Sequence, residues 1–155
     1  MTGNMQIWAN VSTRFDLAED GDGSSRVIHV PGTNSSDWQR MLAALPRSAW
    51  RWIYKYDDKI TALPVSFSAS LQEQGYPSLV VDGEQLGLRC NFYQLDDIEY
   101  FVETSSVQDE QAFERLVTFM RWLCDVVEKP VLLSHEFADD PTRDPIVRIV
   151  PETNR

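Results

Sequence analysis

Residues 98–136 decide the fold of this protein: IEYFVETSSVQDEQAFERLVTFMRWLCDVVEKPVLLSHE. Apolar and polar residues alternate over 98–103, which predicts a strand with one buried face. Apolar residues then recur at helical spacing up to about Val127, and Lys129-Pro130 ends the expected helix. A further apolar run over 131–136 predicts a second strand. This succession predicts a sheet that the helix covers.

The expected long helix has clear signals at its start. Ser105 and Ser106 are candidate N-caps, and Asp109 and Glu110 place negative charge where a helix dipole favours it. Its apolar stripe is wide enough to pack on more than one side. The stripe consists of Phe113, Leu116, Val117, Met120, Leu123, Cys124 and Val127, widened by Phe119, Trp122 and Val126.

Short β-patterns and turn residues make up most of the remaining chain. Alternation or apolar runs predict strands over 5–11, 26–30, 50–56, 60–63, 65–71, 78–81, 84–93 and 146–150. Asp82-Gly83 favours a tight hairpin, because both positions tolerate positive φ. A short helix is expected from Ser36-Asp37-Trp38-Gln39, which has the S-x-x-Q form of a capping box, and Pro46 ends it.

Strands outnumber helices in this reading, and short turns join most of them. This pattern favours antiparallel pairing over parallel pairing through helical crossovers. We therefore predict a single α+β domain over residues 1–155, with a mainly antiparallel sheet packed against one long helix in the C-terminal half and one short helix. The hydrophobic share of 43% is ordinary for a globular protein with one core.

Net charge limits the classes of partner. The chain has 14 Lys and Arg against 24 Asp and Glu, which gives a formal net charge of −10. Such a surface repels nucleic-acid phosphates and anionic membranes, so we expect neither as a partner. No apolar run approaches the roughly 18 residues of a membrane span, and the first residues lack a signal-peptide pattern, so we expect a cytoplasmic protein. A basic protein is the favoured partner, and a charge that merely keeps the domain soluble is the alternative.

The sequence contains no local motif of catalysis or metal binding. It has no phosphate loop, dinucleotide fingerprint, nucleophile elbow or zinc-protease motif. Cys90 and Cys124 form no CxxC pair, so buried free thiols are expected. An EF-type calcium loop starting at Asp20 would need Gly and Glu where Ser25 and Pro31 stand. We predict no catalytic residue, no metal and no cofactor, and we favour a protein that is not an enzyme, although many active sites lack local motifs.

The neighbours Ser134, His135 and Glu136 resemble a catalytic cluster only in the linear sequence. Neighbouring side chains on a strand point to opposite faces, so His135 cannot orient on either neighbour. His29 lies in another short apolar strand and is the second histidine of the chain. We expect each histidine to be a structural residue.

Two groups of acidic residues are candidates for partner binding. Glu99 and Glu103 share a strand face with Phe101 between them, so that a ring can anchor a partner while the charges steer it. The second group is Glu136, Asp139, Asp140 and Asp144, near the C-terminus. Taken singly, each group also has the composition of an ordinary solvated surface.

The order of strand, capped helix, Lys-Pro, strand ending in Glu and acidic loop around 98–136 resembles a known class of proteins. It is similar to the immunity proteins that bacteria encode beside secreted polymorphic toxins, including type VI secretion and contact-dependent effectors. The resemblance covers roughly residues 86–150 and concerns architecture. It implies a small acidic cytoplasmic protein that binds a cognate toxin domain and occludes its basic active site. It assigns no site residue position by position.

Two other functions stay open on the sequence alone. One is a small enzyme whose pocket combines distant residues such as His29, His135, Glu136 and Asp144. The other is an adaptor domain that binds a different protein, as a homodimer through the aromatic residues Trp50, Trp52 or Tyr54. The oligomeric state and the identity of the toxin do not follow from the residues.

Overall fold

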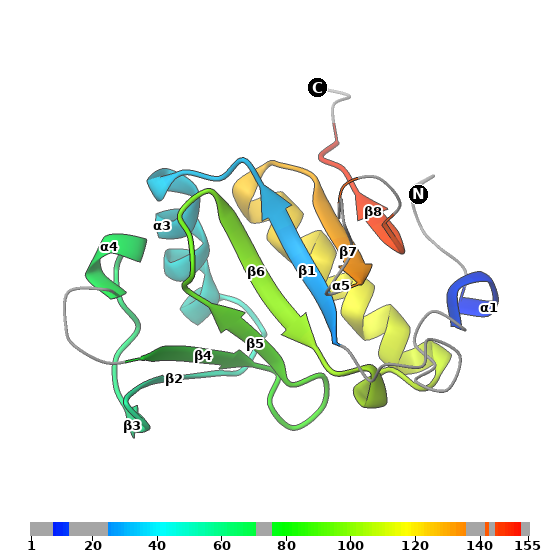
Figure 1. Ribbon diagram of the computed structural model, residues 1–155, viewed down its shortest axis with the longest axis horizontal. Coiled ribbons are helices and arrows are strands. Elements are labelled where there is room, and N and C mark those ends of the chain that lie inside the picture. The colour runs from blue at the N-terminus through cyan, green and yellow to red at the C-terminus, as the bar shows by residue number, and fades with distance from the viewer. Residues whose placement is uncertain (1–7, 13–24, 71–75, 136–141, 143–144, 153–155) are drawn as a thin grey trace.

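The computed structural model describes residues 8–12, 25–70, 76–135, 142 and 145–152. These residues form one eight-stranded sheet in the order β3-β2-β4-β5-β6-β1-β7-β8, in which every neighbouring pair is antiparallel (Figure 1). The strands are β1 (Arg26–Pro31), β2 (Trp52–Tyr56), β3 (Lys59–Ile60), β4 (Pro77–Val81), β5 (Leu88–Asn91), β6 (Asp97–Val102), β7 (Val131–His135) and β8 (Val147–Ile149). The predicted α+β class with an antiparallel sheet is confirmed.

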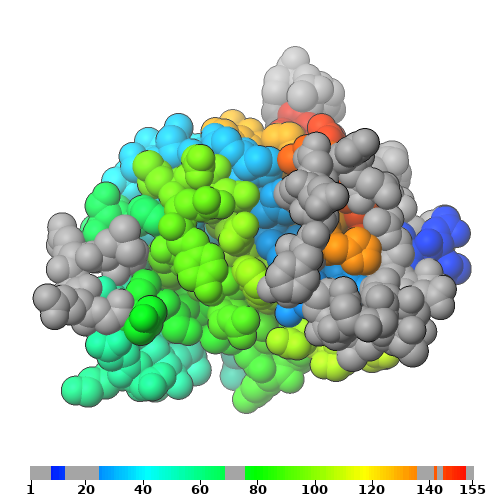
Figure 2. Space-filling view, viewed as in Figure 1, coloured from blue at the N-terminus to red at the C-terminus, as the bar shows by residue number. Residues whose placement is uncertain are grey.

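The two main helices lie on the same face of the sheet (Figure 1). The helical elements are α1 (Trp8–Val11), α3 (Ser35–Ala44), the 3₁₀ turn η2 (Leu45–Arg47), α4 (Phe67–Ser70), the 3₁₀ turn η3 (Thr104–Ser106) and α5 (Glu110–Val127). We call the sheet face opposite α3 and α5 the outer face. The green side chains of β4, β5 and β6 lie in the middle of this face in Figure 2. Within the described residues, no helix has both the length and the apolar character that crossing a bilayer requires.

The core fills the space between the sheet and these helices, with β6 near its centre. Ile98, Tyr100 and Val102 are fully buried, whereas the residues between them are half-buried on the outer face. The ring of Tyr100 lies 4.9 Å from that of Phe119 on α5, edge to face. Its hydroxyl donates to the sulfur of Met41 on α3 at 3.0 Å. The predicted alternation along β6 therefore gives one strand that contacts both helices.

The starts of both main helices differ from the predicted caps. Asp109, not Ser105 or Ser106, caps α5, and its carboxylate accepts the amide of Ala112 at 2.8 Å. The two serines belong to η3, where the Ser106 hydroxyl donates to the backbone oxygens of Glu103 and Leu86. Because η3 uses that hydroxyl, the helix begins later, at the carboxylate that its dipole favours.

The capping box of α3 lies two residues before the predicted one. Asn34 is the N-cap, and its side chain accepts the amide of Asp37 at 3.0 Å. The Asp37 carboxylate accepts the amide of Asn34 in return at 2.9 Å. The S-x-x-Q box from Ser36 to Gln39 was therefore wrong, because the reciprocal pair that satisfies the first amides is Asn34 with Asp37.

Two predicted strands are partly helical in the structure. Trp8–Val11 is the helix α1, although a strand was predicted over 5–11, and Phe67–Ser70 is the helix α4, although a strand was predicted over 65–71. The ring of Trp8 lies 5.5 Å from that of Phe113, and the ring of Phe67 lies 4.8 Å from that of Trp38. These contacts with the core stabilise helical turns in segments too short for local periodicity to identify.

The connection between β4 and β5 is longer than the predicted hairpin. Asp82 does have a positive φ of 57°, as a tight turn requires. The turn nevertheless continues to Gly87, with a φ of 61°, because the backbone oxygen of Asp82 accepts the amides of both Gln85 and Gly87. The predicted strand over 84–93 is therefore limited to β5, and the turn over 82–87 projects toward α5.

Candidate functional site

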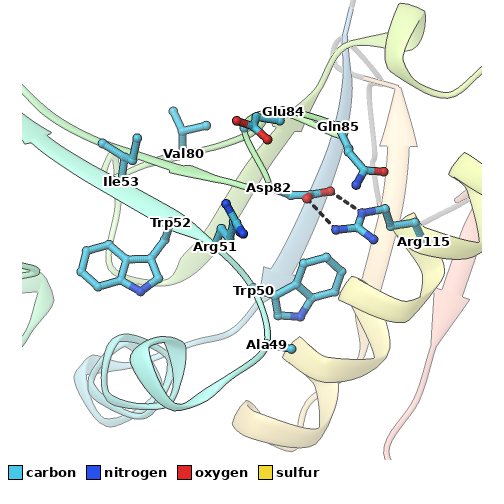
Figure 3. A pocket seen from close by; sticks show the side chains of 11 residues that line it. Ala49, Trp50, Arg51, Trp52, Ile53, Val80, Asp82, Glu84, Gln85 and Arg115 are labelled. Atoms are coloured by element: carbon cyan, nitrogen blue, oxygen red, sulfur yellow. Dashed lines mark hydrogen bonds and ion pairs between the residues drawn. The ribbon is translucent and has the colours of Figure 1, made fainter.

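Two adjoining hollows lie where β2 begins, β4 ends and the first half of α5 passes. The first, of about 730 Å³, is lined by residues 49–53, Val80, the turn residues 82–85 and Arg115 (Figure 3). The second, of about 490 Å³, continues from it along α5 and is lined by Trp50, Gln85, Leu86, Ser106, Asp109, Gln111, Ala112, Glu114, Arg115 and Thr118. Trp50, Gln85 and Arg115 line both, and we call the combined depression the Trp50 groove.

A bidentate ion pair between Arg115 and Asp82 joins the two walls of the Trp50 groove. Nε and Nη2 of Arg115 lie 2.6 Å and 2.7 Å from Oδ2 and Oδ1 of Asp82 (Figure 3). The Asp82 carboxylate also accepts the amide of Leu86 at 3.2 Å, and its own amide donates to the Arg51 oxygen at 2.8 Å. The hydrogen bonds from Arg115 lower the pKa of Asp82 although burial acts in the opposite direction. The carboxylate is therefore ionised at neutral pH and holds Arg115 in one orientation.

The tryptophan at the base of the groove is fixed by the same arginine. The guanidinium carbon of Arg115 lies 5.3 Å from the ring centroid of Trp50, within the range of a cation–π contact. Trp50 also meets Phe119 edge to face, with 5.3 Å between the ring centroids. An aromatic ring, a carboxylate and a guanidinium from three separate segments thus form one rigid unit.

Negative charge exceeds positive charge along the Trp50 groove. Glu84, Asp109 and Glu114 are exposed on its rim, and Asp82 lies beneath them. The guanidinium groups of Arg51 and Arg115 are the cationic lining groups. Four carboxylates against two guanidinium groups favour a cationic occupant, since like charges repel an anionic one.

The first predicted binding group lies on and beside β6. Glu99 and Phe101 are on the outer face, and Glu103 is exposed directly after the strand. The guanidinium of Arg89, the β5 partner of Phe101, lies 5.7 Å from the Phe101 ring centroid. The Arg89 side chain therefore covers part of the Phe101 ring, a contact that the sequence pattern did not predict. The second predicted group, Glu136, Asp139, Asp140 and Asp144, lies outside the described residues.

Glu99 has a different environment from an ordinary surface carboxylate. It stands opposite His29 in the register between β1 and β6. Burial and the neighbouring Asp97 raise the pKa of Glu99, while His29 acts to lower it. Glu99 therefore belongs to a polar cluster on the outer face, with His29 and Asp97.

A Ser–His–Asp row crosses three neighbouring strands within that cluster. Nε2 of His29 lies 3.4 Å from Oγ of Ser134, and its Nδ1 lies 3.6 Å from Oδ2 of Asp97. A nucleophile needs a substrate beside its hydroxyl, but Ser134 and His29 are each only 2% exposed. His135 pairs with Arg26 and so lies on the opposite face of the sheet from His29, so the two histidines do not meet. The row holds three strands together and offers no access to a substrate in this structure.

The structure also bears on the metal site and on the homodimer residues that were considered from the sequence. Among the described residues, no three His, Cys, Asp or Glu side chains are grouped to hold a metal ion. Tyr54 is buried at 2% exposure, so of the three aromatic residues considered for a homodimer only Trp50 and Trp52 reach the surface, where they line the Trp50 groove.

Reasoning from the sequence missed the Trp50 groove. Its defining residues, Trp50, Asp82 and Arg115, lie on three separate segments, and no spacing rule connects them. The one available signal was Arg115. It lies beside the apolar stripe of α5, and its long side chain can extend over apolar surface to a charged partner. Comparison of the chain with protein-family models, curated proteins and solved structures found no match.

Proposed function

We propose that this chain is an immunity protein: it binds a cognate, basic toxin domain in the cytoplasm of the producing cell and blocks the active site of that toxin. The proposal joins the architectural resemblance of residues 86–150 to the charge arrangement on the folded surface. It requires no bond-making chemistry from this chain, since occlusion alone inactivates an enzyme.

The observation that carries the proposal is how the few basic side chains are used. Several described cations are engaged within the fold: Arg26 is buried, Arg40 and Lys129 pair with Asp37, Arg115 pairs with Asp82, Arg89 lies over Phe101, and Arg121 donates to the Val150 oxygen. Exposed carboxylates meanwhile include Asp57, Asp58, Glu84, Asp96, Glu103, Asp109, Glu110, Glu114, Asp125 and Glu128. The exposed cations Arg47, Arg51, Lys59 and Arg148 are fewer than these carboxylates, so the charge offered to a partner is negative on balance.

This distribution suits rapid capture of a basic protein. A nuclease or another enzyme that acts on phosphate-bearing substrates has a cationic cleft, and an acidic partner is attracted to it over long range. Fast association is useful because free toxin harms the cell that makes it. Glu103 is a candidate contact next to the Trp50 groove, since Ser106 on the groove wall donates to the Glu103 backbone oxygen, and Glu99 and Phe101 are candidate contacts on the outer face.

Co-expression tests this function directly. The C-terminal domain of the secreted protein encoded beside this chain is expressed in a bacterial host, with and without the chain. We expect growth arrest with the domain alone, normal growth with both, and a complex that copurifies. A catalytically inactivated domain serves as the control for complex formation without selection. Growth arrest that the chain does not relieve, or the absence of a secreted neighbour with a toxic domain, would contradict the proposal.

A further inference from the structure

We propose that the Trp50 groove receives an extended segment of the partner protein that carries an arginine or lysine side chain. This inference rests on the proposed function, because it names the place and the chemistry of one contact with the basic partner. It differs from the predicted acidic contact that the structure describes, since Glu99, Phe101 and Glu103 do not line the groove.

The shape of the groove favours a peptide segment over a small metabolite. Its two hollows, of about 730 and 490 Å³, follow one another along α5 and the turn over 82–87. Glu84, Gln85, Gln111 and Glu114 are all exposed along it, so the depression is open on one side. Small-molecule sites enclose most of their ligand, whereas an open trough contacts one side of a chain that belongs to a larger body.

Charge selects the side chain that this segment carries. The rim carboxylates Glu84, Asp109 and Glu114 are exposed, and within the groove Asp82 is already neutralised by Arg115. Glu84 lines the first hollow and Glu114 the second, so a cationic side chain is attracted to the rim of either hollow. A phosphate or a carboxylate would meet those same groups with repulsion, so an anionic ligand is disfavoured despite the two arginines.

The floor of the groove supplies directional contacts for the backbone of the segment. Arginine has five N–H donors, and Asp82 accepts two from Arg115. The remaining N–H groups of Arg115 are available to a backbone carbonyl of a bound segment, with the guanidinium held in place by Asp82 and by the Trp50 ring. The opposite end of the first hollow is apolar, with Ile53 and Val80 paired across β2 and β4, which suits a neighbouring apolar side chain.

The test uses the full-length, ¹⁵N-labelled protein and three blocked tripeptides, Gly-Arg-Gly, Gly-citrulline-Gly and Gly-Glu-Gly. Citrulline has nearly the shape of arginine without its charge. The indole N–H signal of Trp50, assigned with Trp50→Phe, is followed at low salt up to about 20 mM peptide, above the millimolar Kd that ligands of this size reach. We expect a saturable shift with the arginine peptide and no saturable shift with the other two.

Two charge-neutralising variants separate the groove from general attraction to an acidic protein. Glu84→Gln combined with Glu114→Gln should weaken binding of the arginine peptide about fivefold, as expected when two solvent-exposed charge contacts are lost. The matched control is Asp125→Asn combined with Glu128→Gln, which removes the same charge at the other end of α5 and should leave the Kd within twofold. Equal shifts with citrulline, no shift at all, or equal weakening by both double variants would overturn the inference.

The two proposals can fail separately. If the toxin complex forms and Glu84→Gln with Glu114→Gln leaves its Kd unchanged, the groove inference is wrong and the proposed function stands. If the arginine peptide binds as described but no adjacent toxin domain is neutralised, the groove stands as a site for basic segments and the immunity function is wrong.

Discussion

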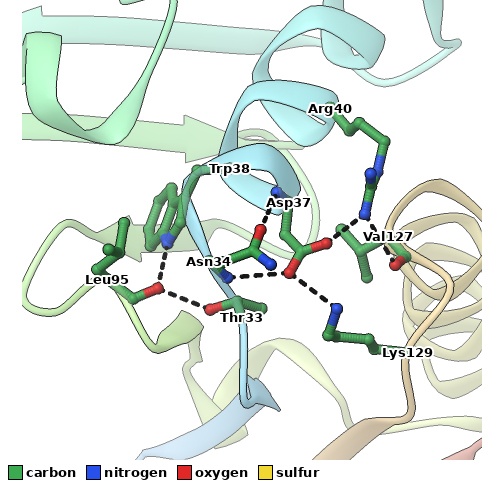
Figure 4. A network of polar contacts seen from close by, with 8 residues as sticks. All are labelled: Thr33, Asn34, Asp37, Trp38, Arg40, Leu95, Val127 and Lys129. Atoms are coloured by element: carbon green, nitrogen blue, oxygen red, sulfur yellow. Dashed lines mark hydrogen bonds and ion pairs between the residues drawn. The ribbon is translucent and has the colours of Figure 1, made fainter.

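Lys129 and Asp37 form an ion pair that joins the end of α5 to the start of α3, with 3.0 Å between Nζ and Oδ2 (Figure 4). The Asp37 side chain is completely buried, whereas that of Lys129 is 31% exposed. The same carboxylate accepts the amide of Asn34 and pairs with Arg40, which also donates to the Val127 oxygen at 3.4 Å. A buried carboxylate is tolerated here because cations and an amide replace its lost hydration.

Asp37→Asn should lower the free energy of unfolding by about 2–4 kcal/mol, because the amide leaves Lys129 and Arg40 without their counter-charge. Urea denaturation followed by tryptophan fluorescence measures the change. Asp125→Asn, an exposed carboxylate on α5, should alter stability by less than about 0.5 kcal/mol. A similar loss of stability in both variants would show that the buried ion-pair network contributes no more than an exposed carboxylate does.

The Asp82–Arg115 pair should make stability depend on acid pH. The pKa of Asp82 is lowered in the folded state, so its contribution is present above the ordinary value of 3.8 and is lost as pH falls through the depressed pKa. Asp82→Asn suits the test because asparagine also tolerates the positive φ. We expect it to cost about 1–2 kcal/mol at pH 7, a modest figure because Arg115 is 39% exposed, and the difference from wild type to shrink below about pH 4. A difference that stays constant from pH 7 to the acid transition would contradict this account.

Glu128→Gly should stabilise the protein. Glu128 ends α5 in the left-handed region, with φ 58° and ψ 39°, where a side chain is strained and glycine is not. We expect a gain of about 0.5–1 kcal/mol in the free energy of unfolding, measured by thermal and urea denaturation. Glu128→Ala is the control, since it removes the same charge without relieving the backbone, and it should give no gain.

Neither Cys90 nor Cys124 should react with a thiol reagent in the native protein. Both are fully buried and free. Burial raises the pKa of Cys90 far above its ordinary value and that of Cys124 to about 11, so almost no thiolate exists at pH 8. Labelling with an aromatic disulfide should proceed only at the rate of unfolding and should reach both thiols in denaturant. Rapid native labelling of either cysteine would show that its segment opens locally.

Association with the toxin domain should slow as salt rises. The surface carboxylates attract a basic partner over distances that salt screens, so the association rate constant should fall about tenfold between about 50 and 300 mM salt while the dissociation rate changes little. Stopped-flow fluorescence of the two proteins measures both constants. Glu103→Gln should reduce the salt dependence slightly, and an association rate that is independent of salt would argue against capture by charge.

Local periodicity was sufficient for the parts of the fold whose burial repeats along the chain. The alternation of Ile98, Tyr100 and Val102 indicated which side of β6 is buried, and the wide stripe of α5 indicated a helix packed against a sheet. Both patterns are long enough for a local signal to outweigh chance. Segments of four residues, such as α1 and α4, offered no such signal, because contacts of Trp8 with Phe113 and of Phe67 with Trp38 stabilise them.

The sequence by itself determined the α+β class, the buried and exposed faces of β6, the course of α5 and the excess of negative charge, since each depends on composition or on neighbours a few residues apart. Only the tertiary structure decided that β1 lies between β6 and β7, which brings His29 to Ser134, and that Asp82 reaches Arg115 across Trp50. Those contacts depend on strand order and register, and such long-range pairing is a property of the whole folded chain that no short window contains.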